Sequence, residues 1–275
     1  MLAFALTVLI GTGSAFAESS KEPDGDEPIR YTIDNKAYWK SYASDGLNLI
    51  TAPARWDSQD WLTAGTVIGV TGGLYIFDAR LQNWVQTNRT QGSNDVATIF
   101  KSAGDELYVF PGLALLYLYG EGTDSEQARR TTLLSLQSWF YSSVLTLGVK
   151  NVAHRHRPNT GDPYDSWDGP RTSSSNVSFP SGHASTAWSV ATVIANEYGE
   201  VAAVPPVAYT VATLVSLSRV NDNDHWASDV FFSSASGYFI GKALTTWHRQ
   251  DSYGSLNVLP LFDGRSAYLL VTYTF

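Results

Sequence analysis

Apolar residues recur in long blocks separated by short polar segments, a pattern typical of a helical bundle. We therefore predict an all-α fold with about six core helices, and the chain shows no internal repeat. Asp124, with Gln127 three positions later, fits a capping box at the start of the longest helix, and Pro111 predicts a kink in the helix before it. The predicted helices cover about residues 60–78, 105–119, 124–150, 183–198, 205–217 and 225–248.

The two ends of the chain differ from the helical domain, which we place at residues 56–250. Residues 1–17 combine an apolar run with small residues and an Ala-Phe-Ala pattern, which predicts a signal peptide. Residues 18–55 begin as an acidic leader and continue as an irregular or short-helical lead-in. Residues 251–275 predict a short C-terminal β-hairpin around Asp263-Gly264, which we expect to pack on the helices.

One predicted helix leaves open whether the protein is soluble. Residues 131–149 are 19 consecutive uncharged residues, which is long enough to span a membrane. Four serines and a glutamine interrupt this segment, and the mean hydropathy of the chain is −0.12. We favour a soluble helical core, with an integral membrane bundle as the alternative.

Charge and composition restrict the partners and the compartment. The net charge of −8 argues against a nucleic-acid partner, because no basic stripe is present to displace counterions from phosphates. The chain has no cysteine, so location depends on the N-terminus. We predict an exported, periplasmic protein, with association with the inner or outer membrane left open. Because no Lys or Arg precedes the apolar run, an N-terminal anchor helix is the alternative to a signal peptide.

A histidine and an aspartate near the start of the last helix could perform nucleophilic chemistry. Residues four apart share a helix face, so Asp229 can reach one ring nitrogen of His225 and fix its tautomer. The other ring nitrogen is then free to attack or to accept a proton. For an isolated pair of this kind, an exposed ion pair without function is the alternative.

The stretch Ser181-Gly182-His183 predicts an anion site rather than a serine nucleophile. A nucleophile elbow needs glycine two positions before and after the serine, where this chain has Phe179 and His183. A helix N-terminus offers free backbone N–H groups and the positive end of the helix dipole. Three cations near predicted helix ends would complete a site for a phosphoryl group without metal, and they are Lys150, Arg157 and Arg219.

These residues form a three-part pattern. It consists of Lys-x6-Arg-Pro at residues 150–158, Pro-Ser-Gly-His at residues 180–183 and Ser-Arg-x5-His-x3-Asp at residues 218–229. The pattern resembles the signature of the type 2 phosphatidic acid phosphatase superfamily. That superfamily includes bacterial class A acid phosphatases, lipid phosphate phosphatases and vanadium haloperoxidases.

The resemblance implies a role for each matching residue. His225 would attack phosphorus to form a phosphohistidine, Asp229 would orient it, and His183 would protonate the leaving oxygen. The phosphate oxygens would be held by Lys150, Arg157, Ser181, Gly182 and Arg219. The resemblance thus implies a phosphoric ester hydrolase that needs no metal or cofactor and acts on a phosphorylated small molecule or a lipid phosphate or diphosphate.

Two other functions stay open. A vanadate-dependent haloperoxidase would use the same anion site for a different reaction. A catalytically silent cell-envelope protein would depend on the C-terminal hairpin instead, although the presence of all the catalytic residues argues against it.

Overall fold

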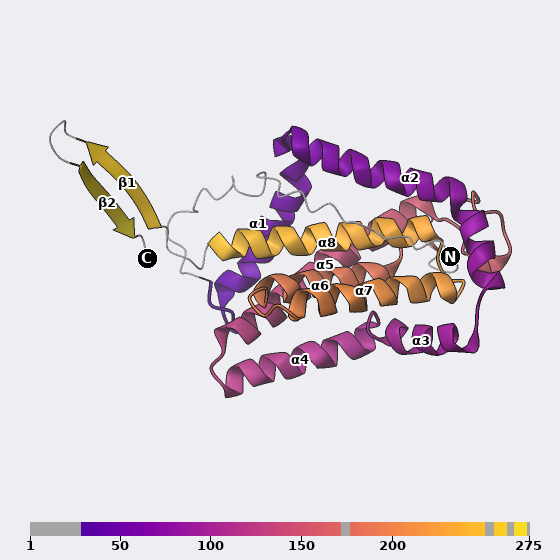
Figure 1. The fold of residues 1–275 in the computed structure, drawn as a ribbon, viewed down its shortest axis with the longest axis horizontal. Helices are drawn as coiled ribbons and strands as arrows, with labels where there is room; N and C mark the ends of the chain where they lie inside the picture. Colours follow the sequence, from indigo (N-terminus) through magenta and orange to yellow (C-terminus); the bar gives the residue numbers. More distant parts are fainter. Residues whose placement is uncertain (1–28, 172–176, 251–255, 263–266, 274–275) are drawn as a thin grey trace.

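The computed structural model describes residues 29–171, 177–250, 256–262 and 267–273. The predicted signal peptide and the acidic leader up to residue 28 lie outside this part. Figure 1 shows the elements in chain order. The described α-helices are α1 (Lys36–Thr51), α2 (Ser58–Thr87), α3 (Gln91–Ser102), α4 (Glu106–Gly122), α5 (Glu126–Ala153), α6 (Gly182–Glu197), α7 (Val204–Asn221) and α8 (Ala227–Gln250). Two short 3-10 turns, η2 (Ala52–Arg55) and η3 (Pro158–Thr160), join them.

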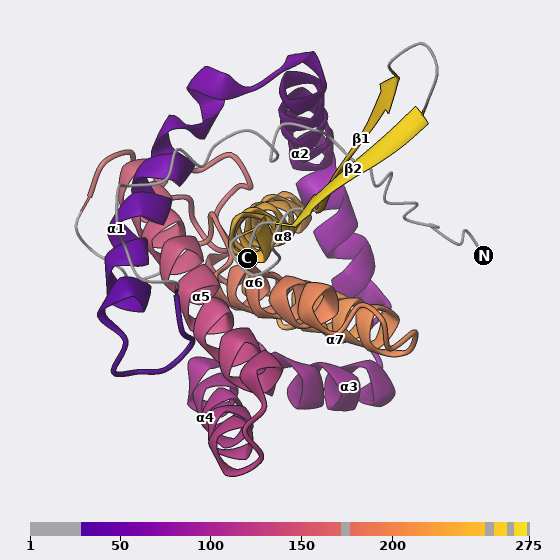
Figure 2. The same ribbon diagram turned by 90° about the vertical axis from the view of Figure 1, so that its left-hand side faces the viewer.

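Helix α6 is the centre of the bundle. It packs against α5, α7 and α8, and α2, α3 and α4 cover α8, α7 and α5 respectively (Figure 2). The backbones of α6 and α8 approach closely because α8 carries glycine where they cross. A Cβ atom at Gly237 would lie 2.6 Å from the Ser185 carbonyl oxygen, and one at Gly241 would lie 2.8 Å from that of Ser189. This close approach brings the N-terminal ends of both helices together.

The all-helical class is confirmed for residues 29–171 and 177–250, but the expected number of helices is too low. The lead-in contains α1, a 16-residue helix, and the segment between the first two predicted helices contains α3. In both helices polar residues interrupt the apolar ones, so neither stands out as a long apolar block in the sequence. Helix α4 continues through Pro111.

The predicted capping box is also wrong by one residue. The N-cap of α5 is Ser125, whose side chain accepts a hydrogen bond from the Ala128 N–H. Asp124 precedes the cap with a positive φ of 52°, a conformation that Asp tolerates better than most residues. The helix then runs to Ala153, one turn beyond the predicted end.

Two strands follow the helices. Strands β1 (Leu256–Phe262) and β2 (Ala267–Tyr273) pair antiparallel, with Leu256 opposite Tyr273. The predicted turn at residues 263–264 lies outside the described residues. Packing of a hairpin on the helices therefore stays a prediction, as do the proposed domain boundaries.

The close crossing of α6 and α8 generates a stability prediction. Gly237→Ala places a methyl group against the α6 backbone and should destabilise the fold by about 1–3 kcal/mol, as overpacking does. Gly72→Ala on α2 is the matched control: no atom lies within 4 Å of its Cβ, so the variant should gain up to about 1 kcal/mol from helix propensity. Thermal or denaturant unfolding measures both, and equal stability of the two variants would contradict the packing argument.

Candidate active site

The structure places the predicted site residues at one end of the bundle. Four helix ends supply them: the last turns of α5 and α7 and the starts of α6 and α8. Their charges act on one another, since the pKa of His225 is affected by Lys150, Arg157 and Arg219 together. The predicted residues at this end are Lys150, Arg157, Ser181, Gly182, His183, Arg219, His225 and Asp229.

The start of α6 carries a buried hydroxyl without a partner. Ser181 is the N-cap residue and is fully buried, yet its side chain makes no capping hydrogen bond and its Oγ has no partner among the described residues. Its backbone N–H donates to Ser233 Oγ at 2.6 Å. Next to it, the space at the Gly182 Cβ position is open for 4 Å. A donor that is buried without a partner costs about 1–3 kcal/mol, which an anionic ligand would offset.

Two of the three cations lie beside the loop that precedes α6. Lys150 Nζ donates to the Val177 carbonyl oxygen at 3.0 Å, and Arg157 Nε donates to the same oxygen at 3.3 Å. Burial, together with the nearby Arg157 charge, lowers the pKa of Lys150 to about 8. The two like charges therefore share a site in which a bound anion would relieve their repulsion.

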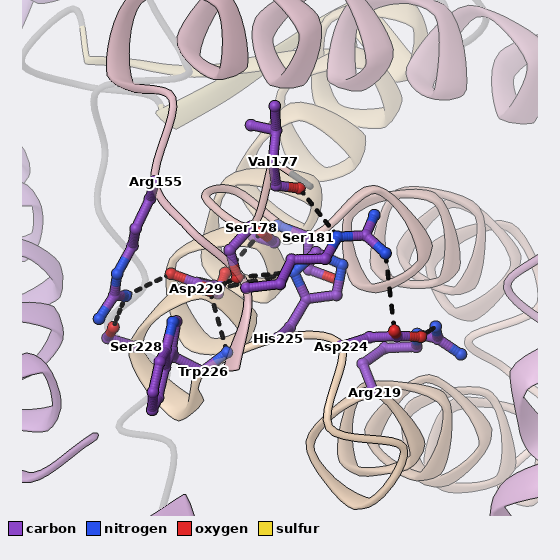
Figure 3. Close-up of polar contacts among 12 residues, drawn as sticks. Arg155, Val177, Ser178, Ser181, Arg219, Asp224, His225, Trp226, Ser228 and Asp229 are labelled. Atoms are coloured by element: carbon purple, nitrogen blue, oxygen red, sulfur yellow. Dashed lines mark hydrogen bonds and ion pairs between the residues drawn. The ribbon is translucent and has the colours of Figure 1, made fainter. Parts of the chain in front are cut away.

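The third cation, Arg219, is buried and has acidic partners. One guanidinium nitrogen lies 3.2 Å from Asp222, a second pairs with Asp224, and its Nε is buried without a partner among the described residues (Figure 3). Asp224 also lies 3.5 Å from Arg157 and accepts a hydrogen bond from Asn159. Asp224 thus partly neutralises two of the cations, a role that the sequence pattern does not indicate.

The predicted contact between His225 and Asp229 is present, but it is longer than a hydrogen bond. His225 precedes α8, which begins at Ala227, so the two residues do not share a helix face. Asp229 Oδ2 lies 3.9 Å from His225 Nδ1, too far for a hydrogen bond. The hydroxyl of Ser178, a residue that sequence reasoning missed, lies 2.5 Å from Asp229 Oδ2 and 3.5 Å from His225 Nδ1 (Figure 3).

A buried arginine that the sequence analysis also missed holds the other oxygen of Asp229. Arg155 is fully buried and its Nη1 donates to Asp229 Oδ1 at 2.5 Å, while its Nη2 donates to Asp78 Oδ2 at 2.7 Å (Figure 3). Asp78, on α2, also accepts from the backbone N–H of Ser228 at 3.0 Å. Arg155 lies inside the first motif, at a position that the motif leaves unspecified. The sequence therefore gives a charged residue near the site but does not show that Asp78 would face it.

Burial and the surrounding cations keep both active-site histidines neutral. Burial lowers the pKa of His225 well below its ordinary value, and the charges of Lys150, Arg157 and Arg219 add to the effect. Burial, followed by the Arg219 charge, lowers the pKa of His183 to about 4. At neutral pH the free protein therefore presents two uncharged imidazoles beside a cationic site.

Among the described residues, no group of three or more His, Cys, Asp or Glu side chains could hold a metal ion. His154 and His156 lie 3.9 and 3.1 Å from the same oxygen of Asp168, and His156 also pairs with Asp162 at 2.7 Å. These contacts account for both histidines as part of the loop structure.

At one end of the helical bundle, Lys150, Arg157 and Arg219 lie near the His225–Asp229 pair. The model of the PAP2 superfamily matches residues 132–253, a segment that holds every predicted site residue. The resemblance stated from the motifs is therefore confirmed.

Individual relatives match either a short segment of this chain or a longer part at low sequence identity. A segment of 66 residues, 24% of this chain, is 46% identical to lipid A 1-phosphatase of Porphyromonas gingivalis and spans only 15% of that protein. The crystal structure of Aquifex aeolicus LpxE is 20% identical with a TM-score of 0.47, covering 62% of this chain and 94% of that one. A transmembrane PAP2-type phosphatidylglycerolphosphate phosphatase from Bacillus subtilis is 17% identical with a TM-score of 0.48, covering 78% and 95% of the respective chains.

The low pKa of His183 generates a prediction for stability against pH. Because its folded-state pKa of about 4 lies below the ordinary 6.5, the unfolded chain binds more protons between these values. The contribution of His183 to stability should therefore fall as pH drops from about 6.5 to 4, and His183→Asn should remove this part of the pH dependence. NMR titration of His183 should also show its pKa rise when inorganic phosphate binds. A titration near pH 6.5 in the free protein would contradict this assignment.

Proposed function

We propose that this protein is a metal-independent phosphatase that hydrolyses lipid phosphates through a phosphohistidine intermediate. The match of residues 132–253 to the model of the PAP2 superfamily supports phosphoric ester hydrolysis. The match to lipid A 1-phosphatase supports a lipid phosphate rather than a soluble ester, although it spans a small part of that relative.

One observation carries the proposal: buried donors converge at the start of α6 without partners. Ser181 Oγ and Arg219 Nε are both buried and unpaired among the described residues, beside the helix N-terminus and next to His225. Buried polar groups are normally hydrogen-bonded, so unpaired donors at one place favour a ligand rich in acceptor oxygens. A phosphoryl group has such oxygens and carries the negative charge that the cations favour.

The geometry supports a division of work between the two histidines. His225 is neutral, so a lone pair on Nε2 is available to attack phosphorus while Nδ1 retains its proton. His183 lies in the first turn of α6 with its side chain one-third exposed, at the open side of the site. It would protonate the leaving oxygen and then activate the water that cleaves the phosphohistidine. The bound phosphoryl charge would raise the pKa of His183 and so supply the acid form that the free protein lacks.

An apolar groove near the site supports a substrate with a hydrocarbon part. A cavity of about 430 Å³ lies between α6 and α7. Its lining begins at Ala187, one turn beyond His183, and continues along Val190 and Ile194 toward Val207. An acyl chain placed there would leave its phosphate at the start of α6.

Membrane association is supported by the exposed face of α2. This helix is long and apolar enough by composition to cross a membrane, and only 6% of its most apolar window is buried. Ile68 and Ile76 are 67% and 69% exposed, and on α4 Leu107 and Leu115 are 72% and 69% exposed. Large exposed apolar surface of this kind marks a contact with a protein or a membrane. We propose a lipid contact, because the substrate would reside there; export to the periplasm remains part of the proposal.

The nucleophile can be tested directly. His225→Ala should lower the release of phosphate from an aryl phosphate, assayed with EDTA present, by on the order of 10³-fold or more. It should also abolish an acid-labile, base-stable phosphoenzyme. His156→Gln is the matched control, since His156 is bound in the neighbouring loop and should leave both signals intact.

The same assay separates the alternatives. Complete loss of wild-type activity with EDTA would contradict the metal-free mechanism, and bromide oxidation by vanadate-loaded protein would favour a haloperoxidase. Absence of both activities in folded protein would favour a silent cell-envelope protein.

The lipid contact predicts vesicle binding. Wild-type protein should float with phosphatidylethanolamine–phosphatidylglycerol vesicles, and Ile68→Asp/Ile76→Asp should float several-fold less, because burying charge in lipid is costly while these exposed positions leave the fold intact. Ile68→Val/Ile76→Val is the control and should float like wild type. Wild-type protein that stays out of the vesicle fraction would refute the contact.

A further inference from the structure

The side chain of Ser178 lies beside both the proposed nucleophile and its carboxylate. Ser178 is fully buried, and its Oγ lies 2.5 Å from Asp229 Oδ2 and 3.5 Å from His225 Nδ1. The direct separation of Asp229 Oδ2 and His225 Nδ1 is 3.9 Å. Each of the two contacts of the Ser178 hydroxyl is therefore shorter than the direct separation of the carboxylate and the imidazole, and both lie within hydrogen-bonding distance.

The number of available protons decides which atoms donate and which accept in these two contacts. An ionised carboxylate only accepts hydrogen bonds, and Asp229 Oδ2 already accepts from the Trp226 backbone N–H at 2.9 Å. The single hydroxyl proton of Ser178 must then point to Asp229, which leaves a lone pair of Oγ facing His225 Nδ1. A lone pair in that position favours the tautomer with its proton on Nδ1 and the free lone pair on Nε2.

The position of Ser178 is fixed by the anion site itself. Its backbone N–H donates to the Arg155 carbonyl at 2.7 Å, and the preceding carbonyl, that of Val177, accepts from Lys150 and Arg157. The backbone of Ser178 also favours a proton on the His225 ring, although burial lowers the pKa of that ring overall. Two consecutive residues, Val177 and Ser178, thus join the cations that would hold phosphate to the histidine that would attack it.

We propose that Ser178 is a positioning residue through which Asp229 orients and stabilises His225. The proposal rests on the phosphatase function proposed above. When Nε2 forms its bond to phosphorus, the bond from phosphorus to the leaving oxygen breaks and His183 protonates that oxygen. The imidazole ring becomes cationic and keeps its Nδ1 proton, which Ser178 Oγ accepts while its own proton remains hydrogen-bonded to Asp229. The carboxylate thereby stabilises the positive ring indirectly, through the Ser178 hydroxyl.

The test combines Ser178→Ala, Asp229→Asn and the double variant. Ser178→Ala keeps the backbone contact but removes the hydroxyl, and it should lower kcat about 10–100-fold, the usual effect of losing an outer partner, with little change in KM. The double variant should lose no more kcat than Asp229→Asn alone, because that single substitution already removes the charge that Ser178 would connect to His225. Ser185→Ala, which removes another buried hydroxyl on α6 that lacks a partner among the described residues, is the control and should keep wild-type kcat.

Two outcomes overturn the proposal. One is a Ser178→Ala kcat within about twofold of wild type, and the other is a double variant whose loss is the product of the single losses. If Ser178→Ala does not fold, Ser178→Cys keeps the size with a weaker donor, and wild-type kcat in that variant would overturn the proposal equally.

A measurement independent of activity separates this proposal from the proposed function. Nitrogen NMR of His225 should report an Nδ1-protonated ring in wild type and a shifted tautomer population in Ser178→Ala. An inactive wild type with this tautomer shift would reject the phosphatase but keep the Ser178 contact. A tautomer population that is unchanged by Ser178→Ala would reject the contact itself.

Discussion

The interaction on which the site depends is the buried ion pair of Arg155 with two carboxylates. Arg155 is fully buried and bonds Asp229 on α8 and Asp78 on α2, and its backbone belongs to the loop after α5. A charge removed from water this completely is tolerated only when its donors are satisfied, and leaving one partner alone would cost about 3–5 kcal/mol. Three separate parts of the chain must therefore meet at this guanidinium before the carboxylate that serves His225 is in position.

From this pair, polar contacts extend in one direction toward the proposed ligand. Arg155 holds one oxygen of Asp229, Ser178 bonds the other, and His225 faces Ser178. On the far side, burial and, after it, the nearby cations lower the pKa of both imidazoles. A phosphoryl group reverses that balance, because its charge offsets the cations and favours the protonated form of His183. In the proposed reaction, the neutral His225 would be ready to attack, and the bound substrate would generate the acid form of His183.

The sequence predicts the parts of this site that are local and misses those that depend on the fold. The three motifs identified the helix-end residues, and the apolar blocks located six of the helices, because both signals lie within short stretches. The amphipathic helix α3 was missed, since its apolar residues are few. Asp78 could not be assigned, because its contact with Ser228 joins positions 150 residues apart. The expected helix pairing of His225 with Asp229 failed because α8 begins after the histidine.

The loop after α5 has a consequence for the spacing of the first motif. After His154, whose φ is 46°, the chain forms isolated bridges at Arg155 and His156, so these two neighbouring side chains point to opposite sides. Arg155 and Arg157 point inward to the carboxylate and the anion site, whereas His154 and His156 both approach Asp168 on the other side. The number of residues in the motif therefore determines which side chains face the site, and not only how far apart its ends lie. Loss of a single residue here would exchange arginines for histidines on the inner side, leaving two buried carboxylates without their cation.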